Sequence, residues 1–289
     1  IGFSIYSRNC RNDFIMMKKL LLILLCLPMI GFGQTYVPDD NFEAYLEANG
    51  MGDGVALNNF VTTANINTVT YLDVFSQNIA DLTGIEAFTA LTHLDCRENQ
   101  LTSLDVSQNI ALIYLNCEHN QLTNLDVSGA TALNELHGDN NQFTSLDVTN
   151  NIALGYFSCA NNQLTSLDVS NNIDLGYFSC ANNQLTSLDV RNGNNSNTVP
   201  FKVTNNPNLT CVNVDNVAWS TANWTVANQN IDSQHYFSNN CSGTSIEEHT
   251  TNKELLKVTD LLGRETKQTT QPLFYIYDDG TVEKRIIIE

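Results

Sequence analysis

The sequence predicts a repeat solenoid, made mainly of short β-strands with irregular or short helical connections and followed by a small antiparallel β module. From Leu91 the chain repeats every 21 residues, five times, with units that start at Leu91, Leu112, Leu133, Leu154 and Leu175. Each unit contains two apolar clusters separated by polar turns, and one coil alone cannot bury both, so the coils must stack. From Lys253 the pattern changes to short apolar alternations with turn residues between them, which is typical of paired strands.

The segment before the repeats predicts export. Met16-Met17-Lys18-Lys19 precedes an apolar run over Leu20–Ile30 and the small-residue stretch Gly31-Phe32-Gly33. A short basic region, an apolar core and small residues before a cleavage point describe a secretory signal peptide over residues 16–33. The run is too short to cross a bilayer, so no transmembrane helix is expected. Residues 1–15 are interpreted as upstream read-through, with Met16 or Met17 as the start.

Each repeat reads L-x-x-L-x-C-x-x-N-x-L, as in Leu91 to Leu101. In a strand, Leu94 and Cys96 point inward while Asp95 between them points outward. Leu101, Leu104 and Val106 make the second apolar corner of the coil. One asparagine recurs in every unit and is expected to hydrogen-bond the backbone of neighbouring turns: Asn99, Asn120, Asn141, Asn162 and Asn183.

This pattern resembles the leucine-rich-repeat family, in the nested variety whose 21-residue unit reads LxxLxCxxNxLxxLDV. The resemblance covers about Val69–Asn195 and implies the solenoid fold, but this fold serves many functions. We expect an N-terminal cap with a short helix over residues 34–68, the solenoid over 69–214, and a C-terminal cap over 215–242.

The cysteines fall into two groups. Four of them occupy the inward strand position, where Gly138 replaces a fifth: Cys96, Cys117, Cys159 and Cys180. A thiol metal site or a disulfide ladder is one interpretation, but parallel neighbours are awkward to cross-link and no CxxC pair is present, so buried reduced thiols are favoured. Cys211 and Cys241 lie beyond the ladder and are expected to form a disulfide that fastens the C-terminal cap.

An outward acidic row is formed by the aspartate of each second half-unit: Asp105, Asp126, Asp147, Asp168 and Asp189. Carboxylates on strands about 4.8 Å apart repel one another. Calcium is one compensating partner, but one carboxylate per coil makes a poor calcium cage. Hydrogen bonding by flanking hydroxyls such as Ser103, Ser107 and Thr102 is favoured, so no metal or other cofactor is expected.

The outward positions of the first strand vary between repeats. The first position carries His93, Tyr114, Glu135, Tyr156 and Tyr177, and the second carries Asp95, Asn116, His137, Ser158 and Ser179. Tyrosines suit interfaces because the ring is apolar and the hydroxyl is polar. The hypothesis is that this face binds a protein or glycan; the alternative is neutral variation on a solvated face.

A polar linker over residues 243–252 leads into the last segment, 253–289. Its motifs are Asp260–Arg264 (DLLGR), Pro272–Thr281 (PLFYIYDDGT) and the terminal KRIIIE. They resemble the C-terminal sorting domain of the type IX secretion route of Bacteroidetes. The resemblance implies delivery to the outer-membrane secretion machinery, whereas the alternative is an ordinary β addition.

The composition narrows the function classes. The chain has 31 acidic and 13 basic residues, a net charge of −18, so nucleic acid is not an expected partner. No nucleophile elbow, phosphate loop or HExxH motif is present, and His93 and His137 lie on separate coils without an evident nucleophile. The sequence therefore predicts a secreted or cell-surface binding protein that is not an enzyme, with a structural or adhesive spacer as the alternative.

Overall fold

The computed structural model describes residues 33–241, 255–259, 273–277 and 282–285. It divides into two compact units that part between Cys241 and Ser242, and each is considered by itself. The upstream residues 1–15, nearly all of the predicted signal peptide and the linker 243–252 lie outside the described residues. Within the described part, no helix has the length and apolar character needed to cross a membrane.

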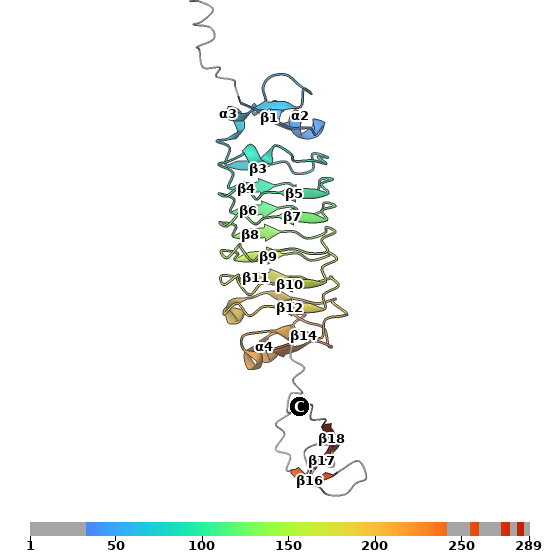
Figure 1. Ribbon diagram of the computed structural model, residues 1–289. Coiled ribbons are helices and arrows are strands. Elements are labelled where there is room, and N and C mark those ends of the chain that lie inside the picture. The colour runs from blue at the N-terminus through green and yellow to red at the C-terminus, as the bar shows by residue number, and fades with distance from the viewer. Residues whose placement is uncertain (1–32, 242–254, 260–272, 278–281, 286–289) are drawn as a thin grey trace, which may run out of the picture. The chain divides into compact units, whose positions relative to one another are not determined.

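The first unit is a β-solenoid whose successive coils stack along one axis (Figure 1). Its first sheet has seven parallel strands in the order β13-β11-β9-β8-β6-β4-β3. Leu72, Leu94, Leu115, Leu136, Phe157, Phe178 and Phe201 are register partners from one strand to the next, and all are buried. The strands are β3 (Tyr71–Asp73), β4 (His93–Asp95), β6 (Tyr114–Asn116), β8 (Glu135–His137), β9 (Tyr156–Ser158), β11 (Tyr177–Ser179) and β13 (Phe201–Lys202).

The second half of each coil builds a second parallel sheet, in two parts. One part pairs β5 with β7, and the other has the order β10-β12-β14-β15. The strands are β5 (Ser103–Asp105), β7 (Asn124–Asp126), β10 (Ser166–Asp168), β12 (Ser187–Asp189), β14 (Cys211–Asn213) and β15 (Tyr236–Ser238). Because β15 pairs in parallel with β14, the solenoid sheet continues into the segment 215–242 that the sequence suggested to be only a cap.

The coil that starts at Leu133 interrupts the second sheet. Its Ser145-Leu146-Asp147 matches the other units in sequence, yet it forms no strand, and Leu146 is only partly buried. In the same coil Gly138 replaces the inward cysteine and Phe143 replaces the inward leucine. A Cβ at Gly138 would lie 3.3 Å from the Phe143 ring, so the larger side chain fills the space that the missing thiol leaves.

The predicted asparagines form a ladder in the buried interior. Asn120 is typical: its Nδ2 donates to the Cys96 carbonyl of the preceding coil and the Cys117 carbonyl of its own, while its Oδ1 accepts the Leu101 N–H. Asn206, which the prediction omitted, extends the ladder by one coil with bonds to Cys180 and Leu185. Each amide thus satisfies backbone groups that would otherwise be buried without partners.

The turn before each ladder asparagine needs left-handed backbone. Glu98, His119, Asn140, Asn161, Asn182 and Asn205 all have φ between 52° and 60°. Asparagine tolerates this region better than most residues, which explains its doubling as Asn-Asn in the later coils.

The N-terminal end is closed by a small α/β layer. It comprises β1 (Gln34–Tyr36) and β2 (Phe60–Thr62), which pair antiparallel, and the helices α2 (Asp40–Ala48) and α3 (Thr63–Ile66). The predicted cap helix is α2; the Asp39 side chain caps its N-terminus, and its Phe42 and Leu46 are buried in the core. Its Glu43 is also buried, but both carboxylate oxygens accept backbone N–H groups, those of Asn58 and Asn59. The short helix η1 (Ile85–Ala87) lies within the first coil.

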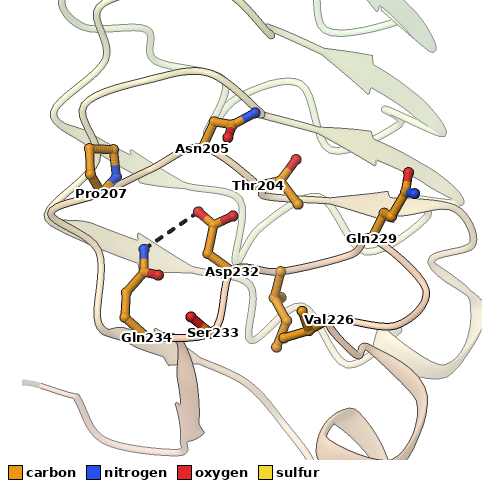
Figure 2. A pocket seen from close by; sticks show the side chains of 9 residues that line it. Thr204, Asn205, Pro207, Val226, Gln229, Asp232, Ser233 and Gln234 are labelled. Atoms are coloured by element: carbon orange, nitrogen blue, oxygen red, sulfur yellow. Dashed lines mark hydrogen bonds between the residues drawn. The ribbon is translucent and has the colours of Figure 1, made fainter.

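The C-terminal end is closed by η2 (Asn195–Asn197), α4 (Val217–Asn223) and the loop that leads to β15. Trp224 stacks on Phe201 with ring centroids 3.7 Å apart and covers the last phenylalanine of the first sheet. The loop 226–234 lies beside the turn 204–207, and together they line a hollow (Figure 2).

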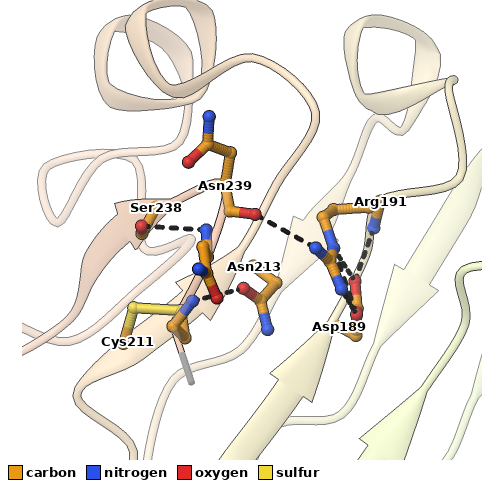
Figure 3. Close-up of a disulfide and its surroundings, with 8 residues drawn as sticks. Asp189, Arg191, Cys211, Asn213, Ser238 and Asn239 are labelled. Atoms are coloured by element: carbon orange, nitrogen blue, oxygen red, sulfur yellow. Dashed lines mark hydrogen bonds and ion pairs between the residues drawn. A yellow bond between two sulfur atoms is a disulfide. The ribbon is translucent and has the colours of Figure 1, made fainter. Parts of the chain in front are cut away.

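The predicted disulfide joins Cys211 on β14 to Cys241, just beyond β15 (Figure 3). Beside it, the Cys241 N–H donates to Asn213 Oδ1 at 2.7 Å, and Arg191 donates to the Asn239 carbonyl at 3.0 Å. A cross-link that closes a loop of this size typically stabilises a fold by about 3–4 kcal/mol. The last strand is therefore held to the solenoid covalently as well as by its pairing.

The second unit contains a three-stranded antiparallel sheet of β16 (Leu255–Thr259), β17 (Leu273–Tyr277) and β18 (Val282–Arg285). The sequence predicts such a module here. The predicted turns at Leu262–Arg264 and Asp278–Gly280 and the terminal Ile286–Ile288 lie outside the described residues.

The fit between Gly138 and Phe143 gives a testable prediction. Gly138→Cys alone is expected to destabilise the solenoid by about 1–3 kcal/mol because it crowds the ring, and Phe143→Leu alone by about 1 kcal/mol because it leaves a void. The double variant, which restores the usual repeat, is expected to cost at least about 0.5 kcal/mol less than the sum. Urea unfolding of the four proteins measures this coupling, and strict additivity would contradict it.

Candidate functional site

An unbroken stack of aromatic rings runs along the outer side of the first sheet. It comprises Tyr71, His93, Tyr114, His137, Tyr156 and Tyr177, and we call it the aromatic ladder. Successive centroids are between 4.0 and 6.1 Å apart; three of the five contacts are stacked and two are tilted, and the tightest pair, Tyr156 and Tyr177, is nearly parallel at 12°. In-register parallel strands place equivalent side chains one strand spacing apart, which is close to the stacking distance of rings.

One ring of the ladder comes from a different position in its strand. Glu135 occupies the place that a ring holds in the neighbouring strands, and His137, two residues further along β8, fills the gap between Tyr114 and Tyr156. The His137 ring lies 4.3 Å from Tyr156 by centroid. The sequence predicted two variable outward columns here but not that residues of both would combine into one row of rings.

Carboxylates surround His137. Glu118 Oε1 lies 3.8 Å from Nδ1 and Glu135 Oε2 lies 3.6 Å from Nε2. The imidazole of His137 is the main cause that lowers the pKa of Glu118, whereas burial raises the pKa of nearby Asp139. Asp139 accepts hydrogen bonds from Ser158 Oγ at 2.5 Å and from the Ala160 N–H at 2.7 Å.

The basic side chain on this part of the face is already paired. The Arg97 Nε lies 3.2 Å from Asp95 Oδ2, and its guanidinium lies 4.7 Å above the Phe75 ring. The acidic side chains of Glu118, Glu135 and Asp139 therefore give this part of the face a negative charge, while Lys202 on β13 is exposed at the C-terminal end of the same sheet.

The second outward column is less accessible than predicted. Asp95 and Asn116 were predicted as contact residues, and Ser158 and Ser179 as outward residues of the same column; all four are buried, and His137 is half-buried. Neighbouring side chains cover this column: the Tyr114 hydroxyl lies 3.4 Å from the Asn116 amide, Arg97 pairs with Asp95, and Ser158 donates to Asp139. The contact surface thus consists of ring edges and the surrounding carboxylates.

The acidic row lies on the second sheet and its carboxylates accept backbone hydrogen bonds. Asp105, Asp126, Asp147, Asp168 and Asp189 each accept the N–H of the residue two positions further on. The predicted donors were flanking hydroxyls, and Thr149 Oγ1 adds such a bond to Asp147. Among the residues that the structure describes, no group of three or more His, Cys, Asp or Glu side chains gathers as a metal site.

The four ladder cysteines are free and buried. Burial raises the pKa of each thiol, and three of them, Cys96, Cys117 and Cys159, donate to a carbonyl of the following coil. They therefore act as small core residues.

Sequence reasoning missed several residues. Tyr71 begins the aromatic ladder one coil before the regular repeats. A second set of fully buried asparagines, Asn109, Asn151 and Asn172, donates to carbonyls of the preceding coil. Their spacing in multiples of 21 residues was the available signal.

These observations decide the architecture. The fold is a leucine-rich-repeat solenoid. No protein-family model matches the chain. Internalin J of Listeria monocytogenes serotype 4b (strain F2365) is 39% identical over 74 residues, which are 26% of this chain and 8% of that protein. The chain thus corresponds to a small part of that relative.

Solved structures from Listeria monocytogenes are also similar. The functional domain of InlJ, which includes a cysteine ladder, is 21% identical with a TM-score of 0.26, over 63% of this chain and 67% of that one. Internalin C2 is 18% identical with a TM-score of 0.39, over 71% and 97%. Internalin InlF is 20% identical with a TM-score of 0.41, over 70% and 68%.

The opposite pKa shifts of two aspartates predict opposite dependences of stability on pH. A raised folded-state pKa, as for Asp139, gives a contribution that is fully present below the ordinary Asp pKa of about 3.9 and is lost as the pH rises through the raised value. A lowered pKa, as for Asp147, gives a contribution that is present above about 3.9 and is lost as the pH falls through the lowered value.

The variants Asp139→Asn and Asp147→Asn test the direction in which each carboxylate makes stability depend on pH. The stability of the wild type relative to Asp139→Asn is expected to fall as the pH rises above about 4. The stability of the wild type relative to Asp147→Asn is expected to fall as the pH drops below about 4. Urea unfolding across this range measures both differences. Two slopes of the same sign would show that the assignment of the buried carboxylate is wrong.

Proposed function

We propose that the protein is a secreted or cell-surface binding protein whose first sheet, along the aromatic ladder, holds a protein partner that carries basic side chains. The observation that carries the proposal is the ladder itself. Aromatic side chains at the centre of a surface supply most of the binding energy in protein interfaces. Here successive strands present them on one continuous face.

The stacking favours a protein over a glycan. A sugar ring binds an aromatic side chain through the ring face, but Tyr114, His137 and Tyr156 each have a neighbouring ring packed on either side, at centroid distances of 4.0 to 5.9 Å. The edges and hydroxyl groups stay available, and these suit the mixed polar and apolar contacts of a protein surface.

The charge of the face favours a basic partner. Glu118, Glu135 and Asp139 lie within two neighbouring coils, and the one guanidinium close to them, that of Arg97, is paired with Asp95. Complementary charge raises the rate of encounter and selects against acidic partners. Such binding weakens as the ionic strength rises.

The ring variant Tyr114→Ala/Tyr156→Ala/Tyr177→Ala tests this surface. Its matched control is Ser103→Ala/Ser166→Ala/Ser187→Ala, which changes the equivalent, exposed first positions of second-sheet strands. Immobilised full-length chains are exposed to a mixture of extracellular proteins, and captured proteins are titrated individually. Affinity is expected to drop at least about tenfold for the ring variant and to stay unchanged for the control.

Two further readouts complete this experiment. Glu118→Gln/Glu135→Gln is expected to weaken binding of the captured protein and to reduce its dependence on salt. Equal capture by the ring variant and the wild type, at matched thermal stability, would contradict the proposal. Absence of any saturable capture would favour the structural or adhesive spacer.

The route to the surface is the second part of the proposal. Residues 16–33 would direct export as a signal peptide, and the segment 253–289 would act as a sorting signal at the outer membrane. The three-stranded sheet of β16, β17 and β18 supports a compact terminal module, and the motifs of that segment resemble type IX sorting domains.

Deletion of Lys253–Glu289 tests the route. The complete chain is expected on intact cells or in the culture fluid, and the truncated chain is expected to accumulate inside the outer membrane. Labelling of intact cells and immunoblotting of culture fluid measure the two pools. Equal export of both chains would show that the terminal module is an ordinary addition.

A further inference from the structure

The hollow at the C-terminal end of the solenoid shares no lining residue with the aromatic ladder; it is largely open to solvent and has a volume of about 790 Å³. It is lined by the turn 204–207 and by the loop 226–234 (Figure 2). Cavities of roughly 300–1,000 Å³ are typical of small-molecule sites. The hollow therefore has room for one or two sugar-sized rings.

One wall of the hollow is fixed by hydrogen bonds. Asp232 Oδ2 accepts the Asn206 N–H at 3.1 Å and Gln234 Nε2 at 3.4 Å, and that Nε2 also donates to the Asn206 carbonyl at 3.2 Å. Asn206 is the last member of the asparagine ladder. The carboxylate is thus held in place by the solenoid interior, and it needs no rearrangement before it meets a ligand.

Most of the other polar side chains that line the hollow have no hydrogen-bond partner among the described residues. The hydroxyls of Thr204 and Ser233 and the amides of Asn205 and Gln229 make no hydrogen bond to any other residue that the structure describes, and neither does Asp232 Oδ1. Pro207, Val226 and Ile231 add apolar surface between them. Several free polar groups around an apolar patch are what a polar ring with C–H faces requires.

The donors and acceptors select the class of ligand. Amides and hydroxyls both donate and accept, and the carboxylate accepts. Buried His235 behind Asp232 receives the Asp232 N–H on Nδ1 at 3.2 Å, and burial lowers its pKa, so it does not offset the negative charge near neutral pH. The negative charge of Asp232 would repel an anion. An ammonium group only donates hydrogen bonds, so it would leave the N–H groups of the Asn205 and Gln229 amides without an acceptor. Hydroxyl groups satisfy both kinds of partner.

We propose that this hollow binds a neutral, hydroxyl-rich ligand of one or two sugar rings, with Thr204, Asn205, Gln229, Asp232 and Ser233 as its hydrogen-bonding residues. This site is separate from the protein-binding face and does not depend on it. A solenoid with both would hold a protein on its strand face and a saccharide at its end.

The full-length chain is titrated with glucose, galactose, mannose, N-acetylglucosamine, maltose and cellobiose by calorimetry and saturation-transfer NMR. Saturable binding of at least one of these neutral saccharides is expected. Thr204→Val/Ser233→Ala, which removes two uncommitted hydroxyls, is expected to weaken that binding about tenfold or more. Ser233→Trp, which fills the hollow, is expected to abolish it.

The control Ser145→Ala/Thr221→Val makes the same chemical changes at exposed positions outside the hollow, and it is expected to bind like the wild type. The ring variant of the strand face should also bind the saccharide normally, which separates this site from the proposed protein-binding function. The proposal is overturned if no neutral saccharide binds, if binding survives Ser233→Trp, or if glucuronic acid or lysine ethyl ester binds more tightly than every neutral saccharide.

Discussion

The bridging of neighbouring coils by buried asparagine amides is the interaction on which the rest of the structure depends. Each coil turns through the interior with backbone groups that no strand partner reaches, and a buried group left unpaired costs about 1–3 kcal/mol. Asn120 and Asn141 each bond both to their own coil and to the preceding one. The amide therefore gives the buried backbone groups of the turn their hydrogen-bond partners, and the same bonds fix the register of successive coils.

Fixed register explains the outer surface. Because Leu94, Leu115 and Leu136 lie directly over one another, the side chains that flank them lie directly over one another too. On the first sheet this places rings at stacking distance, and on the second it places aspartates in a row. The aspartates differ from the rings because hydrogen bonds within their own turn stabilise them: each carboxylate accepts a backbone N–H two residues further on. The row is thus accounted for by the fold, whereas on the first sheet ring edges and the carboxylates around His137 lie at the surface.

In the coil that starts at Leu133, residues that differ from the repeat are compensated by other residues of the same coil. Inside, Phe143 occupies the space beside Gly138, and outside, His137 takes the place in the stack that Glu135 leaves. In both cases a residue from another column of the same coil fills the gap. The first sheet stays continuous through this coil while the second is interrupted, so the face that carries the aromatic ladder runs without a break along these strands.

The sequence by itself determined the period, the inward leucines and thiols, the ladder asparagines and the pairing of Cys211 with Cys241, because a strict repeat places equal residues in equal environments. It also indicated a cap helix and an antiparallel terminal module from local patterns. Only the tertiary structure decided which outward positions are accessible: Asp95 and Asn116 are buried although they alternate with the inward residues, and the Tyr114 hydroxyl lies against the Asn116 amide. The same holds for the continuous ring stack and for the hollow between the turn 204–207 and the loop 226–234. These features arise from contacts between coils, and a linear pattern does not specify how side chains of adjacent columns lean or which loops meet.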